Sequence, residues 1–370
     1  MAVTTYRYLL VDLLSNEIIA ELPLTGVSFT QQLNQAGAFD GHLLISGINS
    51  FQFNVDASTT PGRNAIYVDR NGKLVWGGII WSRTYNSTSQ TLSITARELI
   101  SYFERRRVTE TLDYTNTDQL VIAKNLVEWA QAQPYGDIGL LYNQEGETTS
   151  GILIDRVYYN YELKSIFNAI QDLSRQDDGF DFHIDVDYDL VTGLPTASFN
   201  TYYPKVGIPY DPENPYALVF DFPAGNIVEY EYPEDGTIAA NSVYALGAGS
   251  NEGKQIANAQ NGDYLGNGWA LLEDQANYSD ITDQTVLEQL AIGQVLVTAY
   301  PPTTLKIVAP PYVDPEYGTY EVGDEVRVMI KDSRFPEGLN AVFRIVGLSL
   351  QPGEDGPERV TLTLTNEVII

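Results

Sequence analysis

The sequence predicts a mainly β fold with an α+β middle, in which two β-barrel domains flank a mixed α/β region. Short runs of alternating apolar and polar residues fill both ends of the chain, whereas the middle changes to a helical period. The 370 residues also exceed the ~100–200 that are typical of one domain. We expect domains over residues 1–107, 108–215 and 216–370, the last with long loops and one inserted helix.

The first domain opens in β structure. The run TYRYLLVDLL, from Thr5 to Leu14, is rich in aromatic and branched residues, as expected of a buried strand. Two apolar runs surround Asn71-Gly72, a dipeptide that readily takes positive φ at both positions of a hairpin turn. Thr91 to Ala96 alternates and leads into Arg97 to Arg107, where helical spacing predicts a short helix.

The middle region combines helices with a strand. Ile122, Leu126 and Trp129 share a helix face. A second helix has an apolar stripe from Leu163 to Leu173, with Asn160 as its candidate N-cap. A strand then follows, with two faces that alternate from Phe180 to Leu190: apolar Phe182, Ile184, Val186, Tyr188 and Leu190, and polar Asp181, His183, Asp185, Asp187 and Asp189.

The third domain begins near a segment with five prolines between Pro204 and Pro223, which indicates a connection. The Gly-, Asn- and Gln-rich sequence from Gly247 to Gly268 predicts long surface loops. Asp280 is a candidate cap for the inserted helix, which Pro301-Pro302 would end. Alternating strands resume near Val326 and continue to Leu364.

Composition excludes several classes of protein. The chain has no cysteine, so disulfides and thiolate chemistry are impossible. Its formal net charge of -28 opposes extended contact with a phosphate backbone, although it also simply favours solubility. The first twenty residues lack the pattern of a signal peptide, and no apolar run approaches the ~20 residues of a membrane span. We expect a soluble protein without a membrane anchor.

The sequence shows no pattern typical of a catalytic, cofactor or metal site. His42 and His183 are the only histidines, and neither has the spacing of a metal ligand pair. Nucleotide-binding and serine-hydrolase motifs are missing. The acids from Asp181 to Asp189 could invite calcium, but they favour a solvated strand face over a cation loop. We therefore expect no catalytic residue, no cofactor and no bound metal.

Two surface features are candidate contacts. Arg105, Arg106 and Arg107 form the only basic run, which is either a solvated helix end or a contact with an acidic neighbouring subunit. Trp269 lies in polar loop sequence and is a possible exposed aromatic contact. The other tryptophans, Trp76, Trp81 and Trp129, are expected to pack in cores or hairpins.

Several short segments, in their order along the chain, resemble siphophage minor tail proteins and tail-tip or baseplate hubs: VWGGII at 75–80, LSITAREL at 92–99, YEVGDEVRV at 320–328, FRIVG at 343–347 and VTLTL at 360–364. The resemblance implies that the two barrels are tube-like and that three chains form a ring. It further implies contacts with tail-tube proteins, the tape measure, and fibre or receptor-binding proteins. DNA would pass the ring without specific binding.

The hypothesis is thus a structural hub in the virion, synthesised in the host cytoplasm, and not an enzyme. A carbohydrate- or receptor-binding tail protein is the alternative, and exposure of Trp269 would favour it. A tail-associated cell-wall hydrolase is the third hypothesis, which predicts a deep pocket with two convergent carboxylates where a hub predicts none.

Overall fold

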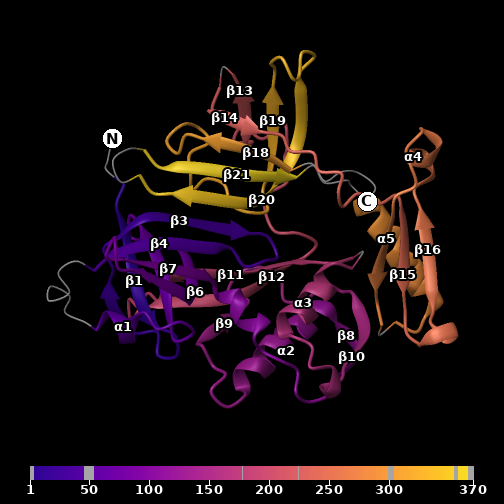
Figure 1. Ribbon diagram of the computed structural model, residues 1–370, viewed down its shortest axis with the longest axis horizontal. Coiled ribbons are helices and arrows are strands. Elements are labelled where there is room, and N and C mark those ends of the chain that lie inside the picture. Colours follow the sequence, from indigo (N-terminus) through magenta and orange to yellow (C-terminus); the bar gives the residue numbers. More distant parts are fainter. Residues whose placement is uncertain are drawn as a thin grey trace.

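Most of the described strands belong to one 13-stranded sheet that joins the two ends of the chain (Figure 1). The computed structural model describes residues 4–45, 54–176, 178–223, 225–279, 281–298, 304–353 and 357–365. Within them the protein is mainly β, as the sequence predicts. The core of this sheet is a single apolar cluster that draws residues from both ends of the chain.

The N-terminal sheet has the strand order β3-β4-β7-β6-β5-β1-β2. Its strands are β1 (Tyr6–Asp12), β2 (Ile18–Glu21), β3 (Leu24–Gln32), β4 (Ala38–Leu44), β5 (Asn64–Arg70), β6 (Lys73–Asn86) and β7 (Thr91–Glu98), and the short helix α1 (Val55–Ser58) precedes β5. Asn71 and Gly72 both have positive φ and join β5 to β6 in the predicted hairpin.

The C-terminal sheet has the strand order β14-β18-β21-β20-β19-β13. Its strands are β13 (Val219–Phe222), β14 (Glu229–Glu231), β18 (Thr304–Ala309), β19 (Glu325–Ile330), β20 (Leu339–Gln351) and β21 (Arg359–Thr365). If β2 is left out and the strands are numbered along the chain within each sheet, both sheets have the order 2-3-6-5-4-1. One direction differs, because β1 runs antiparallel to β5 whereas β13 runs parallel to β19.

The two sheets meet where the end of β20 pairs with β3, from Gly347 opposite Gln32 to Leu350 opposite Phe29. The first part of β20 pairs instead with β19 along the same edge. Among the described strands no sheet closes into a barrel. The two expected β-barrel domains are thus two open sheets in the described part of the single chain, and the β3 edge of the N-terminal sheet pairs with β20 of the C-terminal one.

The middle region packs against the outer side of the N-terminal sheet, and a second apolar cluster joins the two. Its elements are the 3-10 helix η2 (Leu99–Glu104), β8 (Leu112–Asp118), α2 (Gln119–Ala132), β9 (Leu140–Tyr142), β10 (Leu153–Tyr158), η3 (Asn160–Glu162), α3 (Ile166–Ser174), β11 (Asp181–Tyr188) and β12 (Pro195–Tyr202).

Two helix boundaries in this region differ from the sequence expectation. The predicted helix over Arg97 to Arg107 is the shorter 3-10 helix η2, because β7 keeps its pairing with β6 as far as Glu98. The second helix begins after Ser165, whose hydroxyl accepts from the Asn168 N–H, and not after Asn160. Leu163 has a positive φ of 46°, which ends η3 before the longer helix starts.

The segment between β14 and β18 forms a separate module of a small sheet and one long helix, at one end of the long axis in Figure 1. It contains β15 (Ser242–Leu246), η4 (Asn251–Gly253), β16 (Ile256–Gln260), α4 (Gly262–Gly266), β17 (Glu273–Asn277) and α5 (Gln284–Thr298). The predicted long loops from Gly247 to Gly268 therefore include a strand and a short helix. Asp283 accepts the first N–H groups of α5, whereas Asp280, Pro301 and Pro302 lie outside the described residues.

Candidate functional site

A buried ion pair connects the middle region to the C-terminal sheet. Arg344 on β20 donates to Asp181 at the start of β11, and the exposed fractions of their side chains are only 5% and 8%. Asp181 also accepts from the Asn34 amide at 2.7 Å and from the Val206 N–H at 3.0 Å. Arg344 Nε donates to the Gly323 carbonyl at 2.9 Å. A buried pair with its remaining groups hydrogen-bonded holds the regions in one orientation.

A second buried ion pair connects the N-terminal sheet to the loop before β21. Arg70 donates to both carboxylate oxygens of Glu358, at 2.9 and 2.8 Å. The phenols of Tyr6 and Tyr312 donate to the same carboxylate, and the Arg70 guanidinium lies 4.8 Å from the ring centre of Tyr317. The pKa of Glu358 is lowered, because these hydrogen bonds outweigh the effect of burial.

We call the place where the N-terminal sheet, the middle region and the C-terminal sheet meet the joint. A cavity of about 400 Å³ lies there. Its walls come from β3 and β6 of the N-terminal sheet, from β11 of the middle region and from the loop before β19. Acidic and aromatic side chains line it, among them Glu98, Asp185, Glu321, Trp76 and Tyr320. The cavity is thus a space with a mixed polar and apolar lining between three parts of the chain.

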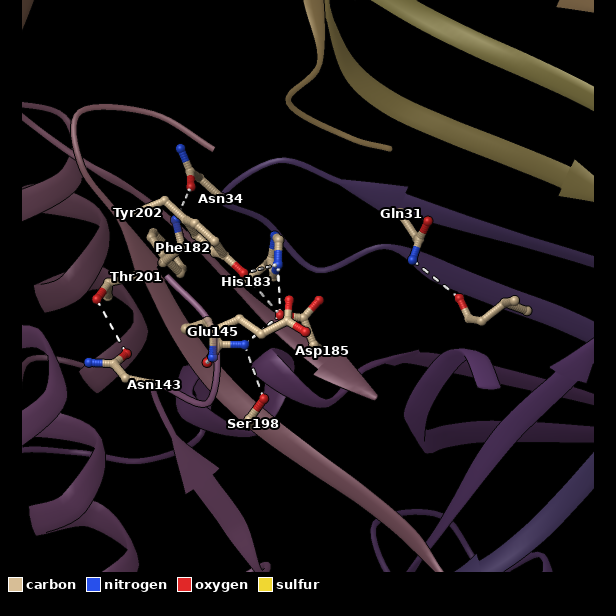
Figure 2. A network of polar contacts seen from close by, with 12 residues as sticks. Gln31, Asn34, Asn143, Glu145, Phe182, His183, Asp185, Ser198, Thr201 and Tyr202 are labelled. Carbon is tan, nitrogen blue, oxygen red and sulfur yellow. Dashed lines mark hydrogen bonds and ion pairs between the residues drawn. The ribbon is translucent and has the colours of Figure 1, made fainter. Parts of the chain in front are cut away.

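His183 lies in the cavity wall beside Asp185, and Figure 2 shows these two side chains pointing toward Tyr202 on the neighbouring strand β12. His183 Nε2 lies 2.9 Å from Asp185 Oδ2, and the Tyr202 hydroxyl lies 3.2 Å from each of these atoms. The Asn200 amide also donates to Asp185 Oδ2 and contacts the Ser198 hydroxyl at 3.0 Å. One carboxylate therefore connects three polar side chains of the β11–β12 pair.

Burial, hydrogen bonds and charges around the cavity shift three pKa values. Burial raises the pKa of Glu98 to about 8, although the Gly37 N–H donates to this carboxylate at 2.6 Å. Burial lowers the pKa of His183, but the hydrogen bond to Asp185 and the charges of Asp185, Glu98 and Glu321 outweigh burial and raise it. Burial raises the pKa of Asp185, but its hydrogen bonds, first of all that from His183, lower it overall.

The expectation that the acids from Asp181 to Asp189 form a solvated strand face is wrong for Asp181, which is buried, whereas the Asp185 side chain is 40% exposed. The apolar face of this strand is confirmed for Phe182, Ile184 and Val186, which pack in the second core, but not for Leu190, which lies beyond the end of β11 and is fully exposed. Asp187 and Asp189 are exposed, as expected. Asp181 is buried with its ion-pair partner Arg344. The sequence did not reveal this pair, because Arg344 lies 163 positions further along the chain and no local pattern reports a contact at that separation.

The hub hypothesis predicts no deep pocket with convergent carboxylates, so the presence of this cavity departs from that prediction. One carboxylate oxygen of Asp185, Oδ2, and one of Glu98, Oε2, accept hydrogen bonds from neighbours within the chain. In the described ranges, no group of three or more histidine, aspartate or glutamate side chains is arranged to hold a metal ion.

The three arginines predicted as a contact differ in their surroundings. Arg106 donates to the Tyr102 hydroxyl at 2.6 Å and to the Ala130 carbonyl at 3.0 Å, and so ties η2 to α2. Arg105 and Arg107 are exposed. A contact with a neighbouring subunit stays a prediction, and these two side chains are the ones positioned to make it.

Trp269 has an exposed fraction of 45% and stacks edge-to-face on Tyr264, with ring centres 5.1 Å apart. Trp76 is buried in the main core, and the Trp81 indole N–H donates to Ser101. Trp129 packs against the second core. The sequence thus separated the exposed tryptophan from the three packed ones. Helices in the described part of the chain are too short or too polar to cross a membrane.

Solved structures of tail proteins share this fold over nearly the whole chain, whereas no family model and no curated protein matches the sequence. A tail protein from Neisseria meningitidis MC58 is 15% identical with a TM-score of 0.59, and the match covers 98% of this chain and 97% of that one. The 43 kDa tail protein of prophage MuSo2 from Shewanella oneidensis is 10% identical with a TM-score of 0.60, over 97% and 98% of the two chains.

The prophage tail protein gp18 from Listeria monocytogenes EGD-e is 13% identical with a TM-score of 0.52, over 96% of this chain and 94% of that one. At these identities the similarity is one of fold. The protein therefore has the fold of phage tail proteins from end to end.

Proposed function

We propose that this protein is a structural component of a phage tail tip, a hub whose copies form a ring that continues or caps the tail tube. The observation that carries this proposal is the repeated strand order of the two sheets within a fold shared end to end with tail proteins. A chain with two similar sheets lets three copies present six similar units, which matches a tube of sixfold symmetry. A ring of three copies also requires heterologous contacts that close on themselves.

In this proposal the ring anchors the tape measure and fibre or receptor-binding proteins in the virion. DNA passes without specific binding, because a channel wall without clustered cations cannot hold phosphates by counterion release. The 49 acidic residues against 21 basic ones support this part. Only side chains within a Debye length of about 8 Å act on the passing DNA, so the claim concerns the channel wall alone.

Light scattering on the purified chain, together with electron microscopy of the particles, tests the proposal. We expect a closed ring with three times the mass of one chain and a channel wall that is neutral to negative. A chain that remains monomeric at every concentration, or a channel lined mainly by Lys and Arg, would contradict it.

A receptor-binding role is the second candidate, and the exposure of Trp269 beside Tyr264 is the observation that favours it. Exposed aromatic faces stack on sugar rings. Titration with soluble cell-wall polysaccharide should then shift the tryptophan fluorescence of the native chain, and Trp269→Ala should abolish the shift. An unchanged spectrum at saturating polysaccharide would remove this candidate.

The proposal includes no catalytic role for the cavity at the joint. Support comes from the carboxylates themselves, since one oxygen of Asp185 and one of Glu98 accept hydrogen bonds within the chain. Incubation with purified peptidoglycan should release no soluble fragments. Release that is lost in Glu98→Gln would establish a hydrolase instead.

A further inference from the structure

The chain contains three Asn-Gly steps: Asn71-Gly72, Asn261-Gly262 and Asn267-Gly268. In such a step the glycine backbone nitrogen can attack the asparagine side-chain amide, because glycine has no Cβ to hinder the closure of a ring. A Cβ placed on any of these glycines would meet no heavy atom of the described residues within 4 Å. Crowding therefore does not separate the three steps, and their hydrogen bonds decide which one reacts.

Asn71-Gly72 is held at both of its reacting groups. The side-chain oxygen of Asn71 accepts from the Thr5 N–H at 2.9 Å and from the Thr5 hydroxyl at 3.3 Å. The Gly72 N–H donates to the carboxylate of Asp69 at 2.7 Å, and Asp69 is only 1% exposed. Attack at Asn71 therefore requires that these hydrogen bonds break and that the tight hairpin turn opens.

Asn261-Gly262 lies at the start of helix α4 and is held at the side chain. The side-chain oxygen of Asn261 caps the helix by accepting from the Tyr264 N–H at 3.3 Å. The Asn261 N–H donates to the Asn241 carbonyl at 2.9 Å. A capping side chain reaches forward over the first turn, so the amide carbon of Asn261 must leave the cap before the Gly262 nitrogen can reach it.

Asn267-Gly268 follows the end of α4 and is the least restrained of the three steps. Asn267 is exposed, and its side-chain amide has no hydrogen-bond partner among the residues that the structure describes. The Gly268 N–H donates to the Leu265 carbonyl at 3.4 Å, which is long for a hydrogen bond. Neither the amide carbon of Asn267 nor the Gly268 nitrogen is thus held strongly away from the other.

We propose that Asn267 is a site of spontaneous deamidation in the folded protein. Hydroxide removes the proton of the Gly268 nitrogen, and this nitrogen then forms a bond to Asn267 Cγ. The bond from Cγ to Nδ2 breaks, and the leaving nitrogen takes a proton from water and departs as ammonia. Water hydrolyses the resulting succinimide at either carbonyl, which leaves aspartate or isoaspartate at position 267. Water and hydroxide are the only co-reactants, so the rate should rise with pH.

The modification changes the surface around Trp269. Either product places a carboxylate close in sequence to an indole that is 45% exposed and stacks on Tyr264. Isoaspartate also lengthens the main chain by a methylene group in the turn where the Trp269 N–H donates to the Tyr264 carbonyl at 3.2 Å. A ligand on this aromatic surface would thus bind differently before and after the modification. The inference does not depend on ring assembly.

The test compares the three steps within the native chain. Mass spectrometry of peptides after mild alkaline incubation measures the replacement of the amide by a carboxyl group, and an isoaspartyl methyltransferase detects the isoaspartate. In the folded chain Asn267 should react about tenfold faster than Asn71 or more, because a local opening that costs about 1.4 kcal/mol lowers the rate tenfold. In denaturant the three steps should react at similar rates, because the hydrogen bonds that separate them are lost.

A pair of variants assigns the released ammonia to its residue. Asn267→Gln should abolish the fast release from the folded chain, since the longer side chain must close a larger ring. Asn277→Gln is the matched control, because Asn277 is also exposed in this module but precedes Tyr278, and it should release ammonia like the native chain. Equal rates at Asn71 and Asn267 in the folded chain, or fast release that survives in Asn267→Gln, would overturn the inference. An equally large preference for Asn267 in denaturant would also overturn it, since the fold would then not select the site.

Discussion

The N-terminal and C-terminal sheets share their strand order but not their burial. In β5, six successive residues are buried, because Ile66 and Val68 enter the main core while Ala65 and Tyr67 enter the second core. In the corresponding strand β19, burial alternates strictly. Its residues Val326, Val328 and Ile330 face the main core, and the residues between them face outward.

The comparison shows that strand order does not determine which residues along a strand are buried. A strand covered on both faces has a continuous apolar run, whereas a strand covered on one face alternates. The middle region of this chain covers the N-terminal sheet alone, so one strand order appears with two patterns. The outward side chains of β19 are only partly covered within the described part of the chain.

The largest effect should come from breaking the joint between the two halves. Asp181→Ala leaves the Arg344 guanidinium buried without its carboxylate, which should lower the free energy of unfolding by about 3–5 kcal/mol. Chemical denaturation measures this change. The exposed pair of Arg7 and Glu21 is the control, since Glu21→Ala should cost about 0–1 kcal/mol. Equal costs for both variants would show that the joint is not held by this pair.

The two-faced burial of the N-terminal sheet can be tested on its outer side. Leu9 on β1 points into the second core and is 1% exposed, so Leu9→Ala should lower the free energy of unfolding by about 2–5 kcal/mol. Arg327 on β19 faces outward, and Arg327→Ala should change it by about 0.5 kcal/mol. Chemical denaturation of both variants measures the two changes in the free energy of unfolding. Similar losses would mean that both sheets are covered on two faces.

The cavity should give the N-terminal side its own pH dependence. The pKa of Glu98 is about 8 in the folded chain, above its ordinary 4.5, so its contribution to stability is fully present below pH 4.5 and is lost as the pH rises through about 8. His183 also loses its contribution to stability as the pH rises, since its pKa is raised from 6.5 in the folded chain. The free energy of unfolding should fall between pH 5 and 8 by at most about 1.4 kcal/mol per pH unit for each proton.

Glu98→Gln keeps the acceptor for Gly37 but does not titrate, so it should flatten most of this slope. The carboxylate of Glu358 on the C-terminal side has a lowered pKa. Its contribution is present above pH 4.5 and is lost as the pH falls, outside the tested window. A slope that survives in Glu98→Gln would assign the pH dependence to another group.

The smallest effects are expected where the chain leaves the N-terminal sheet. Arg105→Gln with Arg107→Gln should change the free energy of unfolding by about 0.5 kcal/mol or less, because both side chains are exposed. Arg106→Gln should cost about 1–3 kcal/mol, since the Ala130 carbonyl and Tyr102 lose their partner. If the exposed arginines contact a neighbouring subunit, their double variant assembles less well at unchanged stability. Unaffected assembly would remove that contact.

Local patterns were sufficient for much of the fold. The Asn71-Gly72 hairpin, the helix face with Ile122 and Leu126, and the alternation of β11 all follow from interactions within a few residues. Helix ends were less certain, because Ser165 and Asn160 are both good caps and only the positive φ of Leu163 separates them. The strand β16 was missed, since its sequence is polar and it is stabilised by its pairing with β15.

The sequence by itself determined the fold class, the acidic surface, the absence of thiol chemistry and the packing of each tryptophan, since these depend on composition and on periods of two to four residues. Only the tertiary structure determined how the two sheets and the middle region meet. The pairing of β20 with β3, the Asp181–Arg344 pair and the cavity at His183 bring together residues that are far apart in the chain. Contacts of that kind depend on how the sheets pack in three dimensions, and the residues on either side of each partner carry no record of them.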